Sequence, residues 1–178
     1  TPATGPNGAA GQFKGERINK RSVERASEID ALTGVSNQKA WGAAKPGVDA
    51  SPNRAVVHGD LDNFKIVNDT HPGKYKTGDK ALSDAFKQAQ KIAKEIDPTA
   101  EVFRSGIGDE MTIATAAGME AKVAKAVNEG VRVKIGEGFD DVTMSTGHGK
   151  TYDAATADMG INKKAMKDVK AAHLVEQQ

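Results

Sequence analysis

The sequence predicts an α/β or α+β domain in which helices pack on a sheet. Three observations predict this fold class. Residues 55–60 form a short β-branched run that ends in an acid, which is typical of a core strand. Residues 77–96 carry apolar side chains at helical spacing. Residues 101–105 and 111–115 have strand character and flank a turn that contains two glycines, which predicts a β-hairpin.

The other elements follow from the same signals, taken in chain order. Residues 1–12 are rich in Gly, Pro, Ala and Thr and predict a flexible linker. Residues 15–29 are charged and favour a helix, and a second short helix is expected to begin near residues 36–37 and to run through Trp41. Residues 45–54 contain two prolines and a glycine, which predicts a loop. The remaining elements are a helix at 118–133, a strand at 142–147 and a long final helix at 154–177.

Composition narrows the class of protein. The chain has 178 residues and a net charge of +1, so it lacks the basic character of proteins that bind duplex nucleic acid, and we expect no nucleic-acid partner. No apolar run approaches the ~20 residues that cross a bilayer, and we expect no membrane contact from this segment. The absence of cysteine excludes a disulfide framework and a thiolate metal site, and it is compatible with the cytoplasmic location that we predict. Because the chain starts at Thr1 without an initiator Met, we interpret it as a piece of a longer protein.

The first candidate site follows the strand predicted at 55–60, in the segment Asp-Leu-Asp-Asn-Phe-Lys. Asp60 and Asp62 point to the same face only if the strand geometry persists; otherwise the first can face a site while the second packs elsewhere. Carboxylates are the ligands that Mg²⁺ prefers, and Lys65 offers a point charge for a phosphate. Taken alone, this pattern is more often a polar loop after a strand.

The second candidate site is the tip of the predicted hairpin, Ser-Gly-Ile-Gly-Asp-Glu. Gly106 and Gly108 allow positive φ and a close approach of the backbone to a ligand. Asp109 and Glu110 could complete a metal site together with Asp60. The alternative is a solvent-exposed turn made of turn-forming residues.

Five segments in a fixed order resemble the motifs of GGDEF domains. They are residues 30–37 (similar to D-x-L-T-G-L-x-N), 60–69 (D-x-D-x-F-K-x-x-N-D), 78–82 (G-D-x-x-L), 142–147 (V-T-x-S-x-G) and 165–170 (A-M-Y-x-A-K). The resemblance implies a palm-like α/β (α+β) fold, with a central, mostly antiparallel sheet flanked by helices as in nucleotidyl cyclases. It also implies a division into a linker at 1–12, an N-terminal helix and first motif at 13–35, and a catalytic or nucleotide-binding domain at 36–178.

The resemblance further implies an activity. Members of the family are diguanylate cyclases, which condense two GTP molecules into cyclic di-GMP with Mg²⁺ (or Mn²⁺), each protomer of a homodimer holding one GTP. Asp60, the Leu61 carbonyl and Asp109 would bind the metal, and Asp109 with Glu110 would be catalytic. The nucleotide-binding residues would be Asn68 and Asp79 for guanine, Lys65 and Lys170 for the triphosphate, and Gly106 and Gly108 in the loop that cradles it.

The sequence departs from the family pattern at three places. Ile107 precedes Gly108 where the family has two adjacent glycines, and a β-branched residue at positive φ would be an outlier unless Ile107 is an insertion. Residues 70–77 are longer than the family segment beside the guanine pocket, and Leu174 replaces a phosphate-binding Arg. Two interpretations follow: an active cyclase, or a degenerate domain without turnover that acts as a nucleotide-binding or protein-interaction module.

Overall fold

The computed structural model describes residues 27–70 and 75–176 of the chain. The linker predicted at 1–12 lies outside these ranges, as does most of the helix predicted at 15–29. Residues 27–29 are described, and they form a turn and a bridge to Ser36, so the helix prediction is wrong there. The cause is local: the Asp30 amide donates to the Val35 carbonyl at 2.7 Å and folds the chain back on itself.

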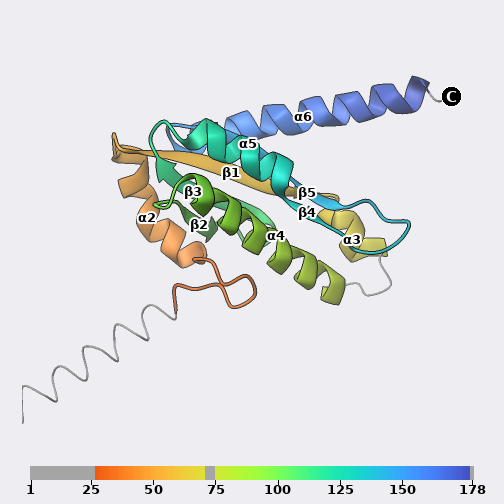
Figure 1. Ribbon diagram of the computed structural model, residues 1–178, viewed down its shortest axis with the longest axis horizontal. Helices are drawn as coiled ribbons and strands as arrows, with labels where there is room; N and C mark the ends of the chain where they lie inside the picture. The colour runs from red at the N-terminus through yellow and green to blue at the C-terminus, as the bar shows by residue number, and fades with distance from the viewer. Residues whose placement is uncertain (1–26, 71–74, 177–178) are drawn as a thin grey trace, which may run out of the picture.

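A five-stranded antiparallel sheet forms the centre of the described chain (Figure 1). Its strand order is β2-β3-β1-β5-β4. The strands are β1 Arg54–Asp62, β2 Glu101–Arg104, β3 Glu110–Ala116, β4 Arg132–Val133 and β5 Val142–Gly149. The hairpin, the core strand and the antiparallel sheet flanked by helices are therefore confirmed.

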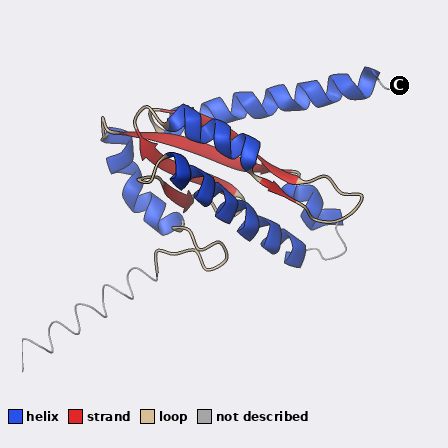
Figure 2. Ribbon diagram, viewed as in Figure 1, coloured by secondary structure: helices blue, strands red, loops and turns tan. Residues whose placement is uncertain are grey.

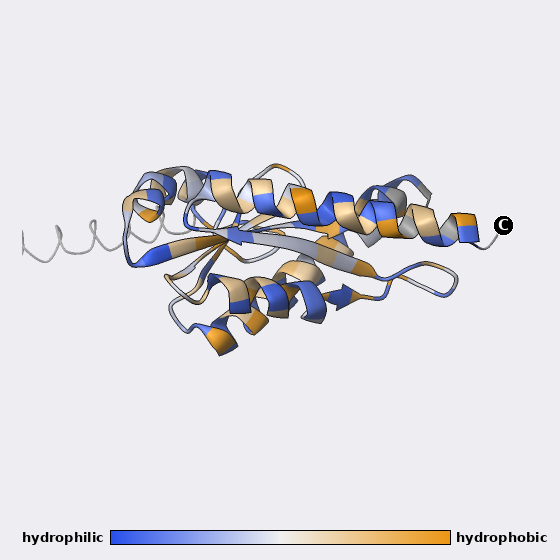
Figure 3. Ribbon diagram, turned by 90° about the horizontal axis from the view of Figure 1, so that it is seen from above, coloured by the Kyte–Doolittle hydropathy of each residue, from blue (hydrophilic) through white to orange (hydrophobic). Residues whose placement is uncertain are grey.

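Helices cover both faces of this sheet (Figure 2). Within the described residues they are α2 Gln38–Ala50, α3 Phe64–Thr70, α4 Tyr75–Ile96, α5 Glu120–Gly130 and α6 Tyr152–Glu176. Figure 3 shows the sheet between α6, which leads to the C-terminus, and helices of the opposite face. Towards its C-terminal end α6 diverges from the sheet (Figure 1). No helix in the described ranges is long and apolar enough to span a membrane.

The larger core lies between the sheet and the pair α4 and α5. Side chains alternate along β1, so Val57 and Leu61 enter this core while His58 and Asp60 face the other way. From α4, the predicted apolar stripe supplies Leu82, Phe86 and Ala89, which are all buried. The helical period of that stripe therefore marked the core face correctly.

The opposite face carries a smaller, aromatic core. The ring of Trp41 on α2 lies 5.2 Å from Phe103 on β2 and 5.5 Å from Tyr152 at the start of α6. The ring of His58 on β1 meets Tyr152 edge-on at 5.3 Å. These contacts hold α2 and α6 to the face of the sheet that also carries Asp60 and Asp62.

The loop predicted at residues 45–54 is wrong for residues 45–50, because α2 continues through Pro46 to Ala50, and it is correct for residues 51–53. Asn37 begins the helix as predicted, and its side chain accepts from the Ala40 amide at 3.0 Å. Pro46 removes the donor that would pair with the Gly42 carbonyl, but both residues are exposed, so water can satisfy that carbonyl. The packing of Trp41 and a Lys45–Asp49 ion pair at 3.3 Å stabilise the remainder of the helix.

Two further elements differ from the sequence-based expectation. Residues 64–70 were not assigned to any element, and they form α3. The helix predicted at 118–133 ends at Gly130, and the chain then pairs with β5 as the short strand β4. That pairing depends on β5, which follows it in the chain, so helix propensity at residues 131–133 carried no information about it.

A glycine on β5 sets how closely α6 approaches the sheet. A Cβ on Gly147 would overlap the backbone nitrogen of Met159 and lie 2.6 Å from the Ala155 carbonyl oxygen. Only a residue without a side chain permits this approach. The close packing fixes α6, and with it the lysines of its next turn, beside the end of β1.

Candidate functional site

The predicted acids gather where β1 ends beside the β2–β3 hairpin. Asp60 pairs in register with Glu110 on β3 and with Ser145 on β5, so it occupies the middle strand of the three. The strand continues through Asp62, so Asp60 and Asp62 lie on the same face of the sheet. This is the first of the two alternatives that the sequence left open. Asp109 directly precedes β3 and lies next to Asp60.

The carboxyl groups of Asp60 and Asp109 share a hydrogen bond. Burial, this hydrogen bond and the negative charge of Asp60 raise the pKa of Asp109 to about 7. Burial also acts to raise the pKa of Asp60, but hydrogen bonds from Asp109 and Lys163 outweigh it and hold that pKa below its usual value. Asp60 is thus the ionised member of the pair, and Asp109 is the member that holds a proton up to neutral pH.

A lysine on α6 that lies outside the predicted site residues reaches these acids. The Nζ atom of Lys163 lies 2.6 Å from Oδ2 of Asp60, 3.5 Å from the Leu61 carbonyl oxygen and 3.9 Å from Oδ1 of Asp62. The signal that could have found it is helical spacing: Lys163 follows Ala155 and Met159 at intervals of two turns and one turn, and these two residues contact β5.

Asp62 is held by hydroxyl groups rather than left open to a ligand. It accepts from Thr143 Oγ1 at 2.9 Å and from Ser145 Oγ at 2.7 Å. Both donors come from β5, in the segment that resembles the V-T-x-S-x-G strand. The hydroxyls of that motif therefore orient the second β1 acid and leave Asp60 as the acid that faces the site.

A pocket of about 520 Å³ adjoins the acids. Four of the predicted site residues line it: Asp60, Leu61, Lys65 and Asp109. The other lining residues are Asp62, Asn63, Phe64, Lys163, Met166 and Lys167. The pocket thus combines carboxylates on one side with three lysines from α3 and α6, which is a charge pattern suited to a metal-bound or lysine-bound phosphate chain.

The two residues expected to read guanine lie close together but do not line this pocket. A Cβ on Gly78 would overlap the carboxamide of Asn68, so the start of α4 packs directly on α3. Asp79, which is exposed, follows Gly78 in sequence. Lys170 lies on α6 one turn beyond Lys167, and its side chain is outside what the structure describes.

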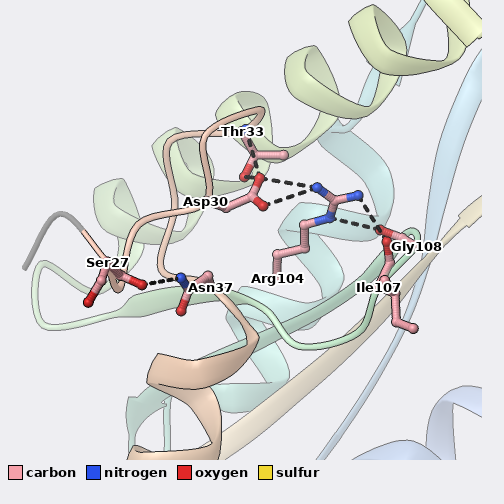
Figure 4. A network of polar contacts seen from close by, with 7 residues as sticks. All are labelled: Ser27, Asp30, Thr33, Asn37, Arg104, Ile107 and Gly108. Carbon is pink, nitrogen blue, oxygen red and sulfur yellow. Dashed lines mark hydrogen bonds and ion pairs between the residues drawn. The ribbon is translucent and has the colours of Figure 1, made fainter.

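The hairpin tip is organised by an arginine (Figure 4). Arg104 Nε donates to the Gly108 carbonyl at 3.0 Å, and its Nη2 donates to the Ile107 carbonyl at 3.1 Å. Its Nη1 contacts both carboxylate oxygens of Asp30, at 3.1 and 3.2 Å. The segment at residues 30–37, which resembles the first family motif, therefore stabilises the hairpin tip through Arg104.

The expected backbone strain at Ile107 is absent. Among the described non-glycine residues, positive φ occurs only at Asn63, and neither Gly106 nor Gly108 uses the left-handed region. The Ile107 side chain instead projects from the tip and is 90% exposed. Gly106 serves close approach: a Cβ there would lie 2.5 Å from Oε2 of Glu110, whose side chain folds over it.

The donor set suits a divalent cation in its chemistry. Asp60, Asp109 and the Leu61 carbonyl present only oxygen, which hard cations such as Mg²⁺ prefer. Within residues 27–70 and 75–176, no group of three or more His, Asp or Glu side chains is arranged to hold a metal. The two carboxylates would therefore need further oxygens, from a phosphate or water, to complete a coordination shell.

Comparisons with known proteins identify the fold. No protein-family model matches the sequence, and no curated protein sequence matches it. Among solved structures, the diguanylate cyclase SiaD of Pseudomonas aeruginosa, in complex with its activator SiaC, is 19% identical with a TM-score of 0.65, and the match covers 88% of this chain and 66% of that one.

Two Caulobacter crescentus structures also match. The coiled coil and GGDEF domain of DgcB, in complex with c-di-GMP, is 20% identical with a TM-score of 0.61, covering 93% of this chain and 92% of that one. A sensory box/GGDEF family protein is 26% identical with a TM-score of 0.53, covering 80% and 99%. The described chain therefore has the α/β fold of GGDEF domains, as the order of its motifs predicted.

Proposed function

We propose that this GGDEF-fold domain is a nucleotidyl cyclase of the diguanylate cyclase type, which condenses two GTP molecules into cyclic di-GMP. One observation carries the proposal: the carboxyl groups of Asp60 on β1 and of Asp109, which directly precedes β3, meet at the edge of a lysine-lined pocket. The fold supports it, because SiaD is a diguanylate cyclase and DgcB was solved with c-di-GMP.

The residues in and near the pocket would have distinct roles in this reaction. Lys65 and Lys167 would hold the triphosphate, with Lys170 further along α6. Asn68 and Asp79 would bind the guanine edge, to which an amide can donate and accept and a carboxylate can accept. Gly106 and Gly108 would keep the hairpin tip narrow beside the nucleotide.

Asp109 is the candidate general base. Its carboxyl group lies beside Asp60 at the edge of the pocket, where it would accept the proton of a 3′-hydroxyl. Glu110 follows it in sequence and pairs in register with Asp60. Mg²⁺ or Mn²⁺ held by Asp60, Asp109 and the Leu61 carbonyl would neutralise charge on the transferred phosphoryl group.

A second candidate function is a domain that binds nucleotide, or a partner protein, without turnover. The observation that favours it is the 2.6 Å contact between Lys163 Nζ and Asp60, because this ammonium already neutralises the principal metal carboxylate. A nucleotide could then be held by lysines alone. The two candidates differ in a product that can be measured.

The test incubates the chain with Mg²⁺ or Mn²⁺ and each nucleoside triphosphate, followed by product analysis. Cyclic dinucleotide formation that is lost in Asp109→Asn and kept in Asp140→Asn, an exposed loop acid, supports the cyclase. No product, but a thermal shift with millimolar GTP, supports the binding module. The absence of both product and thermal shift would overturn the cyclase and the nucleotide-binding domain alike, and it would leave the protein-interaction form of the second candidate.

A further inference from the structure

We propose that Lys163 is a tethered cation that occupies the metal position of this site and has to be displaced before a divalent cation can bind. The inference deepens the proposed function, since it concerns the cation site on which that function rests. Two of the oxygens that contact Nζ, Oδ2 of Asp60 and the carbonyl of Leu61, are the same two that the motif assigns to a metal.

The two cations would compete for the same carboxylate oxygen. A separation of 2.6 Å between Lys163 Nζ and Asp60 Oδ2 is a short, charge-assisted hydrogen bond. A Mg²⁺ ion would have to lie ~2.1 Å from the same oxygen. The ammonium and the ion would then be like charges a few ångströms apart in a partly buried pocket, so one excludes the other.

The charge of the cluster explains why the position is filled. Asp60, Asp62 and Asp109 bring three carboxyl groups to one face of the sheet end, and Lys163 contacts two of them directly. A neighbouring cation lowers the cost of ionising grouped carboxylates. With Lys163 in place, the pocket has its compensating charge without a metal.

The ammonium group of Lys163 has an alternative position within the same pocket. Lys163 is only one-quarter exposed, but its flexible four-carbon stem lines the same pocket as Lys65 and Lys167. When a divalent cation and a triphosphate arrive together, the ammonium can leave Asp60 and bind the phosphate chain. Metal alone offers the ammonium no new partner, so metal alone is expected to bind weakly.

The test measures Mn²⁺ binding to the chain without nucleotide, by electron paramagnetic resonance of the free ion. Lys163→Met keeps the stem and removes the charge. Lys164→Met, on the exposed neighbour, makes the same charge change away from the pocket. We expect Mn²⁺ to bind Lys163→Met about tenfold or more tighter than wild type, because the competing charge is gone, and Lys164→Met to match wild type.

Equal Mn²⁺ affinity in wild type and Lys163→Met would overturn the inference, as would equal gains in both variants. If Lys163→Met does not fold, acylation footprinting of wild-type lysines replaces it. Mn²⁺ with a non-hydrolysable GTP analogue should then change the reactivity of Lys163 relative to Lys164, and unchanged reactivity overturns the inference. A failed cyclase assay leaves these outcomes untouched, so the two proposals fail separately.

Discussion

Arg104 joins segments that are far apart in sequence. Its guanidinium binds Asp30 from the first motif and the carbonyls of Ile107 and Gly108 at the hairpin tip. Burial acts to raise the pKa of Asp30, but hydrogen bonds from Thr33 and the charge of Arg104 hold it below its usual value. The loop conformation thus depends on a planar donor that reaches in two directions.

Lysine cannot reproduce that geometry. We expect Arg104→Lys to lower the free energy of unfolding by about 1–3 kcal/mol, because a point charge replaces a forked donor with several bonds. Urea denaturation measures this, and hydrogen exchange should quicken at residues 105–109. Arg132→Lys, on the exposed edge of β4, is the control and should change stability little. An equal decrease in the free energy of unfolding in both variants would show that the hydrogen bonds of the Arg104 guanidinium do not stabilise the fold.

Asp109 makes metal binding depend on pH. Its folded pKa of about 7 means that a proton competes with the metal below neutral pH. We expect the affinity of Lys163→Met for Mn²⁺ to rise as the pH increases from 6 to 8. Adding Asp109→Asn to Lys163→Met should remove this rise. A rise that persists in the double variant would contradict the role given to Asp109.

Rising pH has the opposite effect on the stability that Asp109 contributes. The folded group keeps its proton to about pH 7, whereas the ordinary pKa of an Asp carboxyl group is 3.8. Its contribution to stability is therefore complete below that ordinary pKa and disappears as the pH rises through 7. The free energy of unfolding should accordingly change with pH in the same way for wild type and Asp109→Asn below pH 4. Between pH 4 and 7 the pH slopes of the two proteins should differ.

Local patterns predicted some site residues and not others. Asp60, Leu61, Lys65 and Asp109 stand in recognisable segments, and the structure brings them to one pocket. Lys163 could not be assigned in this way, because its partner Asp60 is 103 residues away and its own segment reads as an exposed lysine-rich helix. Only the packing of α6 on β5 makes that pair.

The course of α2 shows a local rule overridden by packing. Pro46 and Gly47 signal a break, yet the helix continues from Gln38 to Ala50. Trp41 anchors it on Phe103, and Asp49 accepts from the Tyr152 amide at 2.9 Å, so both ends are fixed to other elements. Pro46 on the exposed face of α2 destabilises the helix less than the loss of these contacts would.

The approach of α6 to β5 gives a sharp prediction. We expect Gly147→Ala to lower the free energy of unfolding by about 3 kcal/mol, because the new methyl group meets backbone atoms of α6 that cannot turn away. Gly160→Ala is the matched control, since a Cβ at this exposed helical position meets nothing within 4 Å. It should stabilise the protein by up to about 1 kcal/mol. Urea denaturation distinguishes the two, and similar values for both would contradict the packing described.

The arrangement of the sheet was predictable because its pairings are mostly between elements with clear signals. The β2–β3 hairpin and the long strand β1 carry β-branched or alternating residues, and antiparallel order follows once they pair. The two-residue strand β4 has no such signal. It exists because β5 offers it an edge, which is a property of the assembled sheet rather than of residues 132–133.

The site lies at one end of the sheet, and in the proposed reaction its pocket would hold one GTP. If the proposed reaction joins two GTP molecules, two copies of the chain have to bring their pockets together. We expect the initial rate per chain to rise with protein concentration and to level off once the dimer forms. Rates measured over a dilution series, beside light scattering, check this. A rate per chain that is constant while the protein is monomeric would contradict a two-chain reaction.

Neighbouring strands in fixed register carry the acids, whereas the lysine comes from a helix on a flexible stem. Sliding Asp60 relative to Asp109 would break a row of main-chain bonds, so the spacing of the anionic pair is resistant to drift. The positive partner can be exchanged by a single codon on α6 without disturbing that row. A substitution at position 163 therefore changes the charge of the site while the spacing of its carboxyl groups stays the same.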